Sequence, residues 1–274
     1  MARFTGFEPD DAPPGIDTTV AHSARIYDFI LGGKDNFEAD RRAAAAIMEA
    51  NPHMATAMRQ NRALMRRMTA YLARAGVRQF LDIGTGLPTS PNVHEVAQSI
   101  EPTSRVVYVD NDPIVLAHAR ALLASGPEGA CAYIDADARD PDKILAHQKL
   151  RDTLELSEPV ALMFFGIMQF IPDDVGPHAI ITRLLGALPS GSYLAIQQPT
   201  ADFYPPGVSA QAAYQRAGIP FQYRTREQFA AFLDGLEIVE PGITVMADWH
   251  PDDDPRSGAS VTDSPAYAAL ARKP

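Results

Sequence analysis

The chain has 274 residues, 46% of them hydrophobic and 21% charged, with a formal net charge of −10. This length and composition suit one large globular domain, and the acidic charge disfavours non-specific nucleic-acid binding, which needs a basic surface to displace counterions. The single cysteine, Cys131, excludes an internal disulfide and a cysteine-based metal site. The seven histidines show no ligand spacing, so we expect no metal, and the acidic charge leads us to expect no nucleic-acid partner.

Residues 1–20 are rich in proline, aspartate, glycine and threonine, which predicts a flexible N-terminal arm. This stretch has no long apolar run and carries acidic residues where a secretory signal peptide has lysine or arginine. The longest apolar segment, residues 160–170, is too short to span a membrane. The expected location is cytoplasmic, with no membrane partner.

Residues 21–76 have helical periodicity and predict an N-terminal helical cap or lid. The first helix begins near Ser23 and ends at Gly32 and Gly33, because glycine accepts the left-handed conformation that follows a helix. A second helix is expected over 39–49. A third runs from residue 54 to Gly76, with apolar side chains on one face at a 3.6-residue period. The methionines of this region are expected to fill gaps in the core, the alternative being a plastic acceptor pocket: Met48, Met54, Met58, Met65 and Met68.

After Gly76, strand patterns alternate with helix patterns, as in a parallel sheet that helices cover on both faces. Asn92 and Glu95 form a capping box at the start of one helix. A helix over 226–233 precedes antiparallel strands around 237–245 and 267–271. The prediction is an α/β fold with a Rossmann-like, doubly wound, mostly parallel seven-stranded sheet over residues 77–274. The other strands are expected at 79–83, 105–109, 130–134, 159–165 and 192–196, and the helices between them at 93–100, 114–123, 143–154 and 175–188.

The first strand ends in the turn Asp82-Ile83-Gly84-Thr85-Gly86. Its two glycines allow a tight turn and let a ligand approach the backbone closely. A dinucleotide site has a third glycine where this chain has Thr89, and Asp82 would repel a pyrophosphate but suits a cationic amino-acid group. The combination favours binding of S-adenosylmethionine over NAD.

The next two strands end in acidic residues at the same expected edge of the sheet. Asp110, followed by Asn111, is the expected acceptor for two ribose hydroxyls, while Asp112 caps the following helix. After the third strand, Asp137 is expected to accept the adenine amino hydrogen, and the backbone N–H of Ala138 to donate to the ring. Together the three strand ends predict a nucleoside-binding α/β domain.

The fourth strand runs into Gly166 and Gln169. Gly166 would let the backbone come close to the bound nucleoside. Gln169 is a polar residue within an apolar run, and either contacts the ligand or satisfies backbone groups of its own loop.

Several longer runs resemble a bacterial S-adenosyl methyltransferase family, formerly classed as a domain of unknown function. The resemblance covers nearly the whole chain from about Val20 and implies a class I methyltransferase fold, an N-terminal helical cap and bound S-adenosylmethionine. The family often has a histidine where this chain has Gln169, and glutamine cannot serve as a general base, so we assign no catalytic residue. The runs that carry the resemblance are residues 24–37, 61–62, 80–89, 107–113, 133–137 and 271–274.

The N-terminal run also has a physical interpretation as a lid over the sheet edge. Arg25, Lys34 or Arg62 would hold the methionine carboxylate, Tyr27 would pack near the sulfonium, and Gly33 would shape the turn beside the ligand. The alternative is a structural cap with surface charges.

These observations predict an S-adenosylmethionine-dependent methyltransferase that acts on a small-molecule acceptor. The first alternative is a non-catalytic module that binds S-adenosylmethionine or S-adenosylhomocysteine as a sensor or partner protein, which the glutamine at position 169 mildly favours. The second is a nicotinamide-dependent oxidoreductase, which the missing third glycine disfavours.

Overall fold

The structure, a computed structural model, describes residues 16–115, 117, 125–203, 209–251 and 260–274. Most of the expected N-terminal arm and of the helix expected over 114–123 lie outside these residues. Among the described residues, no helix is both long enough and apolar enough to cross a membrane.

Three helices form the N-terminal cap, as predicted: α1 (Ser23–Ile30), α2 (Glu38–Ala50) and α3 (Met54–Arg74). Helix α1 begins where the His22 imidazole Nδ1 accepts the Ala24 N–H at 3.3 Å, and ends at Gly32, whose φ of 87° is left-handed. The buried Asp40 carboxylate accepts the Phe37 N–H at 2.9 Å and so satisfies a free donor at the start of α2.

The sheet has the strand order β3-β2-β1-β4-β5-β8-β6, with β7 also paired to β8. Strands β1 to β5 are parallel, and β8 runs antiparallel to β5. The expected seventh strand over 237–245 is two short strands on the edge of β8, which makes the sheet eight-stranded. The bounds are β1 (Gln79–Ile83), β2 (Arg105–Asp110), β3 (Ala130–Asp135), β4 (Ala161–Phe164), β5 (Tyr193–Pro199), β6 (Glu237–Ile238), β7 (Thr244–Val245) and β8 (Ala266–Arg272).

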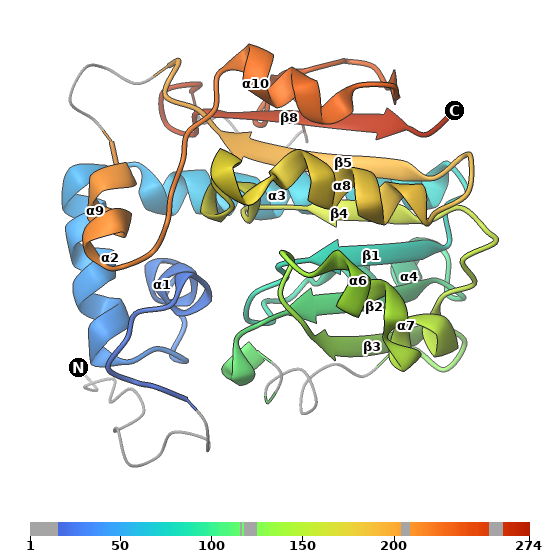
Figure 1. The fold of residues 1–274 in the computed structure, drawn as a ribbon, viewed down its shortest axis with the longest axis horizontal. Helices are drawn as coiled ribbons and strands as arrows, with labels where there is room; N and C mark the ends of the chain where they lie inside the picture. The colour runs from blue at the N-terminus through green and yellow to red at the C-terminus, as the bar shows by residue number, and fades with distance from the viewer. Residues whose placement is uncertain (1–15, 116, 118–124, 204–208, 252–259) are drawn as a thin grey trace.

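Helices cover both faces of the sheet (Figure 1). Leu81 and Ile83 of β1 face one layer, formed by α6 (Pro141–Ala146), α7 (Gln148–Thr153), α8 (Pro177–Gly186) and α10 (Arg226–Ala230). Phe80, one residue along the strand, faces the other layer, formed by α3 and α4 (Val93–Ile100). The helix expected over 143–154 is broken into α6 and α7 because His147 adopts an extended conformation between them.

Helix α9 (Gln211–Arg216) packs with the cap, although it lies far along the chain from the other cap helices. Tyr214 and Phe221 are buried in one apolar cluster with Ile26 of α1 and Ile47 of α2. Figure 1 shows α9 beside α2, at the end of the sheet toward which β1 to β5 point. Residues 210–221 therefore join the cap that the sequence placed over 21–76 alone.

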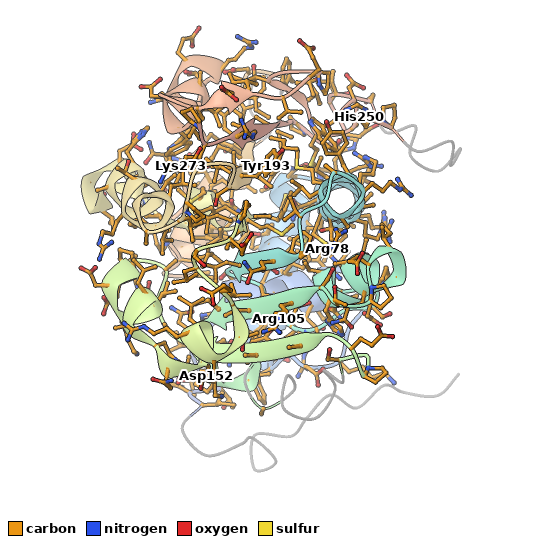
Figure 2. All side chains as sticks on the ribbon, turned by 90° about the vertical axis from the view of Figure 1, so that its right-hand side faces the viewer. Arg78, Arg105, Asp152, Tyr193, His250 and Lys273 are labelled. Carbon is orange, nitrogen blue, oxygen red and sulfur yellow. The ribbon has the colours of Figure 1, made fainter. Side chains whose placement is uncertain are left out.

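The opposite end of the sheet carries basic side chains, three of which are labelled in Figure 2. Arg78 donates to the Ala73 carbonyl at 3.1 Å, and Arg105 donates to the Thr153 carbonyl at 3.2 Å. Lys273 donates to two carbonyl oxygens at the end of α8 and just after it. These cations satisfy carbonyl groups at helix ends, so they stabilise this end of the fold.

Truncating a side chain in the cap cluster should measurably destabilise the protein. Ile47 is fully buried, so Ile47→Ala should lower the free energy of unfolding by about 2–5 kcal/mol in urea titration. Ile238 is 47% exposed, and Ile238→Ala should change it by about 0.5 kcal/mol or less. Equal effects of the two changes would contradict the assignment of Ile47 to a packed interface.

Candidate functional site

A cavity of about 290 Å³ lies at the carboxyl ends of β1, β2 and β4, where the strand order changes direction. This is the position at which open α/β sheets bind their ligands. The cap closes the cavity from the other side through residues of α1 and α3. The structure brings together in its walls ten of the predicted site residues: Tyr27, Arg62, Asp82, Gly84, Gly86, Asp110, Asn111, Asp137, Ala138 and Gly166.

The turn after β1 depends on two glycines in left-handed conformations, Gly84 at φ 71° and Gly86 at φ 66°. The Gly84 N–H donates to the Val109 carbonyl at 2.8 Å, which anchors the turn to β2. A Cβ on Gly84 would lie 2.7 Å from the Ile167 side chain, whereas a Cβ on Gly86 would meet no atom within 4 Å. The backbone at Gly86 is therefore open to a ligand.

Asp82 is a buried carboxylate on the wall of this cavity. Burial raises its pKa to about 6, although a hydrogen bond from Thr85 and the positive charge of Arg62 oppose the rise. A cationic amino group bound beside Asp82 would replace the solvation that the carboxylate has lost.

Asp110 is also buried and holds the glycine turn in place. One carboxylate oxygen accepts the Gly86 N–H at 2.8 Å, and the other accepts the Asp112 N–H at 2.9 Å. Burial raises the pKa of Asp110, and these two hydrogen bonds oppose the rise. An ionised carboxylate has about four lone-pair positions, so two stay available for ribose hydroxyls.

Asp137 is engaged more fully than the sequence suggested. Arg139 donates to both of its carboxylate oxygens, at 2.9 and 2.5 Å, and Asn111 donates to one of them at 3.1 Å. The ion pair lowers the pKa of Asp137. Arg139, which the sequence analysis did not single out, also lines the cavity beside Ala138.

Arg25, predicted as a ligand for the methionine carboxylate, lies outside the cavity walls and serves the cap instead. Its guanidinium Nε lies 3.5 Å from the carboxylates of both Asp40 and Asp112, and another nitrogen donates to the Val20 carbonyl at 2.8 Å. Arg25 therefore has structural partners within the cap, because its charge is balanced by buried acids. His22, which was not predicted, lines the cavity and pairs with Asp112 at 2.9 Å.

Gly33 also lies outside the cavity walls, contrary to the prediction. A Cβ at this position would fall 1.9 Å from the Asp28 carboxylate, so glycine is needed here for packing in the turn. Asp112 has the capping role that was predicted, since its carboxylate accepts the Ile114 N–H at 3.0 Å.

Arg62 is the cap cation that faces the cavity. Its guanidinium donates to the carbonyl oxygens of Thr89 and Pro91, which places α3 against the loop after β1. Because Arg62 is close enough to oppose the rise in the pKa of Asp82, both charges of a zwitterionic amino acid have a partner nearby.

A second pocket, of about 60 Å³, adjoins the main cavity. Gln169, predicted as a cofactor contact, lines this pocket and not the main cavity. Met54 and Met58 also line it and Met65 lines the main cavity, so three of the cap methionines border a pocket rather than only filling the core. The two spaces share five lining residues: Ser23, Tyr27, Asn61, Gly166 and Phe170.

The fold and the cavity define a nucleoside-binding protein of the class I methyltransferase type, and comparison with known proteins identifies its family. A sequence model of the S-adenosyl methyltransferases matches residues 9–274, so the chain belongs to this family. A DUF574 family protein from Streptomyces avermitilis has 52% identity and a TM-score of 0.91, over 94% of this chain and 99% of that one. A putative methyltransferase from Thermobifida fusca has 39% identity and a TM-score of 0.86, over 95% and 98%.

More distant structures share the fold alone. Magnesium protoporphyrin IX methyltransferase from Synechocystis, crystallised with S-adenosylmethionine, is 11% identical with a TM-score of 0.50, over 96% of this chain and all of that one. A search of curated proteins gave no match. The family match and the related structures show that the protein is a methyltransferase whose cofactor is S-adenosylmethionine.

The residues of the main cavity fit this cofactor. Asp82 is an ionisable acid in a site that has lost its water, the backbone at Gly86 is open, and Asp110 retains lone pairs for hydroxyls. The same acids would repel the pyrophosphate of a dinucleotide. Among the described residues, no three histidine, cysteine or acidic side chains are grouped as a metal site.

Cofactor binding should depend on the ionisation of Asp82. The carboxyl becomes neutral below its pKa of about 6, so affinity for S-adenosylhomocysteine should be about tenfold lower at pH 5 than at pH 7. In Asp82→Asn, calorimetric titration should find weaker binding with little change over this pH range. Asp152, at the other end of the sheet, supplies the control Asp152→Asn, which should behave like the unmodified protein (Figure 2). If Asp82→Asn kept the tenfold pH dependence of the unmodified protein, the assignment would be wrong.

Proposed function

We propose that the protein transfers the methyl group of S-adenosylmethionine to a small-molecule acceptor held in the second pocket. The observation that carries the proposal is the shared wall, because Tyr27, Asn61 and Gly166 line both spaces. A molecule in the second pocket would lie next to the cofactor, and holding two reactants side by side can supply much of a rate enhancement.

The cofactor would be held along the carboxyl edge of the sheet. Asp82 would bind its amino group and Arg62 its carboxylate, while Asp110 would accept hydrogen bonds from the ribose hydroxyls. Asn111 and the backbone at Ala138 would border the adenine. When bound, S-adenosylmethionine supplies a methyl group activated by its positively charged sulfur.

The side chains around the acceptor would orient it and exclude water rather than accept a proton. Burial raises the pKa of Tyr27 and of Tyr223, so both hydroxyls stay protonated at neutral pH. Gln169 cannot accept a proton at this pH. The acceptor atom must therefore carry a nucleophilic lone pair when it binds.

A small acceptor suits the size and surroundings of the second pocket. One water molecule needs about 10–15 Å³ of such space. The second pocket, of about 60 Å³, therefore has room for roughly four to six water-sized groups. That space accommodates one small ring or a comparable fragment. The net charge of −10 gives no support to a nucleic-acid acceptor.

The nucleoside site can be tested by titrating the protein with S-adenosylmethionine, S-adenosylhomocysteine and NAD. We expect micromolar binding of the two sulfur nucleosides and a loss of about tenfold or more in Asp110→Ala, because hydrogen bonds to a charged group are removed. Asp234 is exposed, so Asp234→Ala serves as the control. Binding of NAD alone would favour the oxidoreductase alternative.

Methyl transfer can be tested with methyl-labelled cofactor and a metabolite extract of Streptomyces avermitilis, the source of the 52% identical relative. Label should enter molecules below about 1 kDa, the range of ligands that pockets of this kind enclose. Label found only in protein or nucleic acid would overturn the proposal. Tight cofactor binding without any labelled product would favour the non-catalytic binding module.

A further inference from the structure

Two residues that line the second pocket each have a buried amide oxygen without a hydrogen-bond partner: Asn61 Oδ1 and Gln169 Oε1. Both residues are 7% exposed. Buried acceptors in folded proteins are nearly always satisfied, because leaving one without a donor is costly. These two oxygens therefore point to a donor that the polypeptide itself does not provide.

The orientation of each amide follows from its other hydrogen bonds. Gln169 Nε2 donates to the Gly166 carbonyl at 2.8 Å, so the oxygen must be the free end. The Tyr27 hydroxyl donates to the Met58 carbonyl at 2.8 Å, so it can only accept from Asn61 Nδ2, which lies 3.4 Å away. Both amides thus present an acceptor, and not a donor, as their free group.

Gly166 holds the two amides near each other. A Cβ on this residue would lie 3.0 Å from Asn61 Nδ2 and 3.9 Å from Gln169 Nε2. The Gly166 N–H donates to Gln197 Oε1 at 3.1 Å, which satisfies the third amide of the pocket. Both amide groups therefore lie beside Gly166, which lines the second pocket and the main cavity.

The opposite walls of the pocket are aromatic. Tyr214 and Phe221 stack with ring centroids 4.7 Å apart, and Tyr223 meets Phe221 edge-on at 5.0 Å. Phe170 packs against the same cluster, 5.7 Å from Phe221. A flat ring inserted here would gain further stacked or edge-on contacts, and the thioethers of the pocket methionines adapt to such rings.

The described side chains that line the pocket offer no charge to balance that of a ligand. Among the described residues that line it, the polar side chains are hydroxyls and amides, and none is charged at neutral pH. A charged ligand would lose its water without gaining an opposite charge, which is strongly unfavourable. The pocket thus favours a neutral ligand.

We propose that the acceptor is a neutral, single aromatic or heteroaromatic ring with an N–H or O–H group that donates to Asn61 Oδ1 or Gln169 Oε1, or to both where the group is an NH2. This inference rests on the proposed function only in placing the acceptor in the second pocket. The aromatic wall selects a flat ring, and the amide pair selects a donor group and orients it toward the cofactor cavity.

Four matched probes can test this class on the protein saturated with S-adenosylhomocysteine, using fluorine NMR titration. The probes are 4-fluorophenol, 4-fluoroanisole without the donor, 4-fluorobenzoate with a charge, and trans-4-fluorocyclohexanol without the aromatic ring. We expect 4-fluorophenol to bind about tenfold or more tightly than the other three, the ratio expected for one buried hydrogen bond. Equal binding of the four probes, or preference for 4-fluorobenzoate, would overturn the inference.

Substitution of Gln169 and Asn61 tests whether their amide groups cause the preference for 4-fluorophenol. Gln169→Leu should weaken 4-fluorophenol about tenfold, to the level of 4-fluoroanisole, while binding of S-adenosylhomocysteine stays within twofold. Gln148 is exposed at the far end of the sheet, so Gln148→Leu should leave all affinities unchanged. Asn61→Leu is the second variant and should reduce the same preference. Preserved discrimination in both variants would overturn the inference.

The proposed function and this inference fail in different ways. If labelled methyl enters only macromolecules, the proposed function is wrong, whereas the ranking of the four probes still decides the chemistry of the pocket. If labelled small molecules form but the four probes bind alike, the proposed function stands and this inference is wrong.

Discussion

The parallel pairing of β1 with β2 and β4 is the constraint on which the rest of the structure depends. Ile83 is in register with both Val109 and Phe164, so all three strands end at one edge of the sheet. The acids and glycines that follow them must then meet in one cavity. Asp110 reinforces this arrangement, because it links the Gly86 turn to the end of β2 and still faces the ligand space.

The cap contributes walls to both the main cavity and the second pocket. Its N-terminal helices and α9 share one apolar cluster, so residues distant in sequence form one wall. Charged groups such as Arg62 and Asp82 line the main cavity, whereas the second pocket is uncharged and aromatic. The division matches a polar, zwitterionic cofactor beside an acceptor of different chemistry.

The glycine turn and the strand-end acids were predictable from the sequence because local rules govern them: a strand pattern, a turn and then a polar residue. Arg25 and Gly33 were predicted to contact the cofactor but lie outside the cavity walls, because a charge or a glycine in a run of sequence does not reveal its partner. Arg25 is balanced by Asp40 and Asp112, and Gly33 is required by the Asp28 side chain. Only spatial neighbours distinguish these roles from ligand binding.

By itself, the sequence determined the parallel α/β sheet, the N-terminal helices and the set Asp82, Gly84, Gly86 and Asp110, since these depend on hydrophobic periodicity and strand ends. The tertiary structure alone decided that α9 joins the cap, that Arg139 and Asn111 engage Asp137, and that Gln169 lies in a second pocket. The physical reason is the distance along the chain over which each feature is decided. Hydrophobic periodicity shows which face of one helix or strand is buried, whereas a pocket is formed by side chains from several elements that are far apart in the sequence.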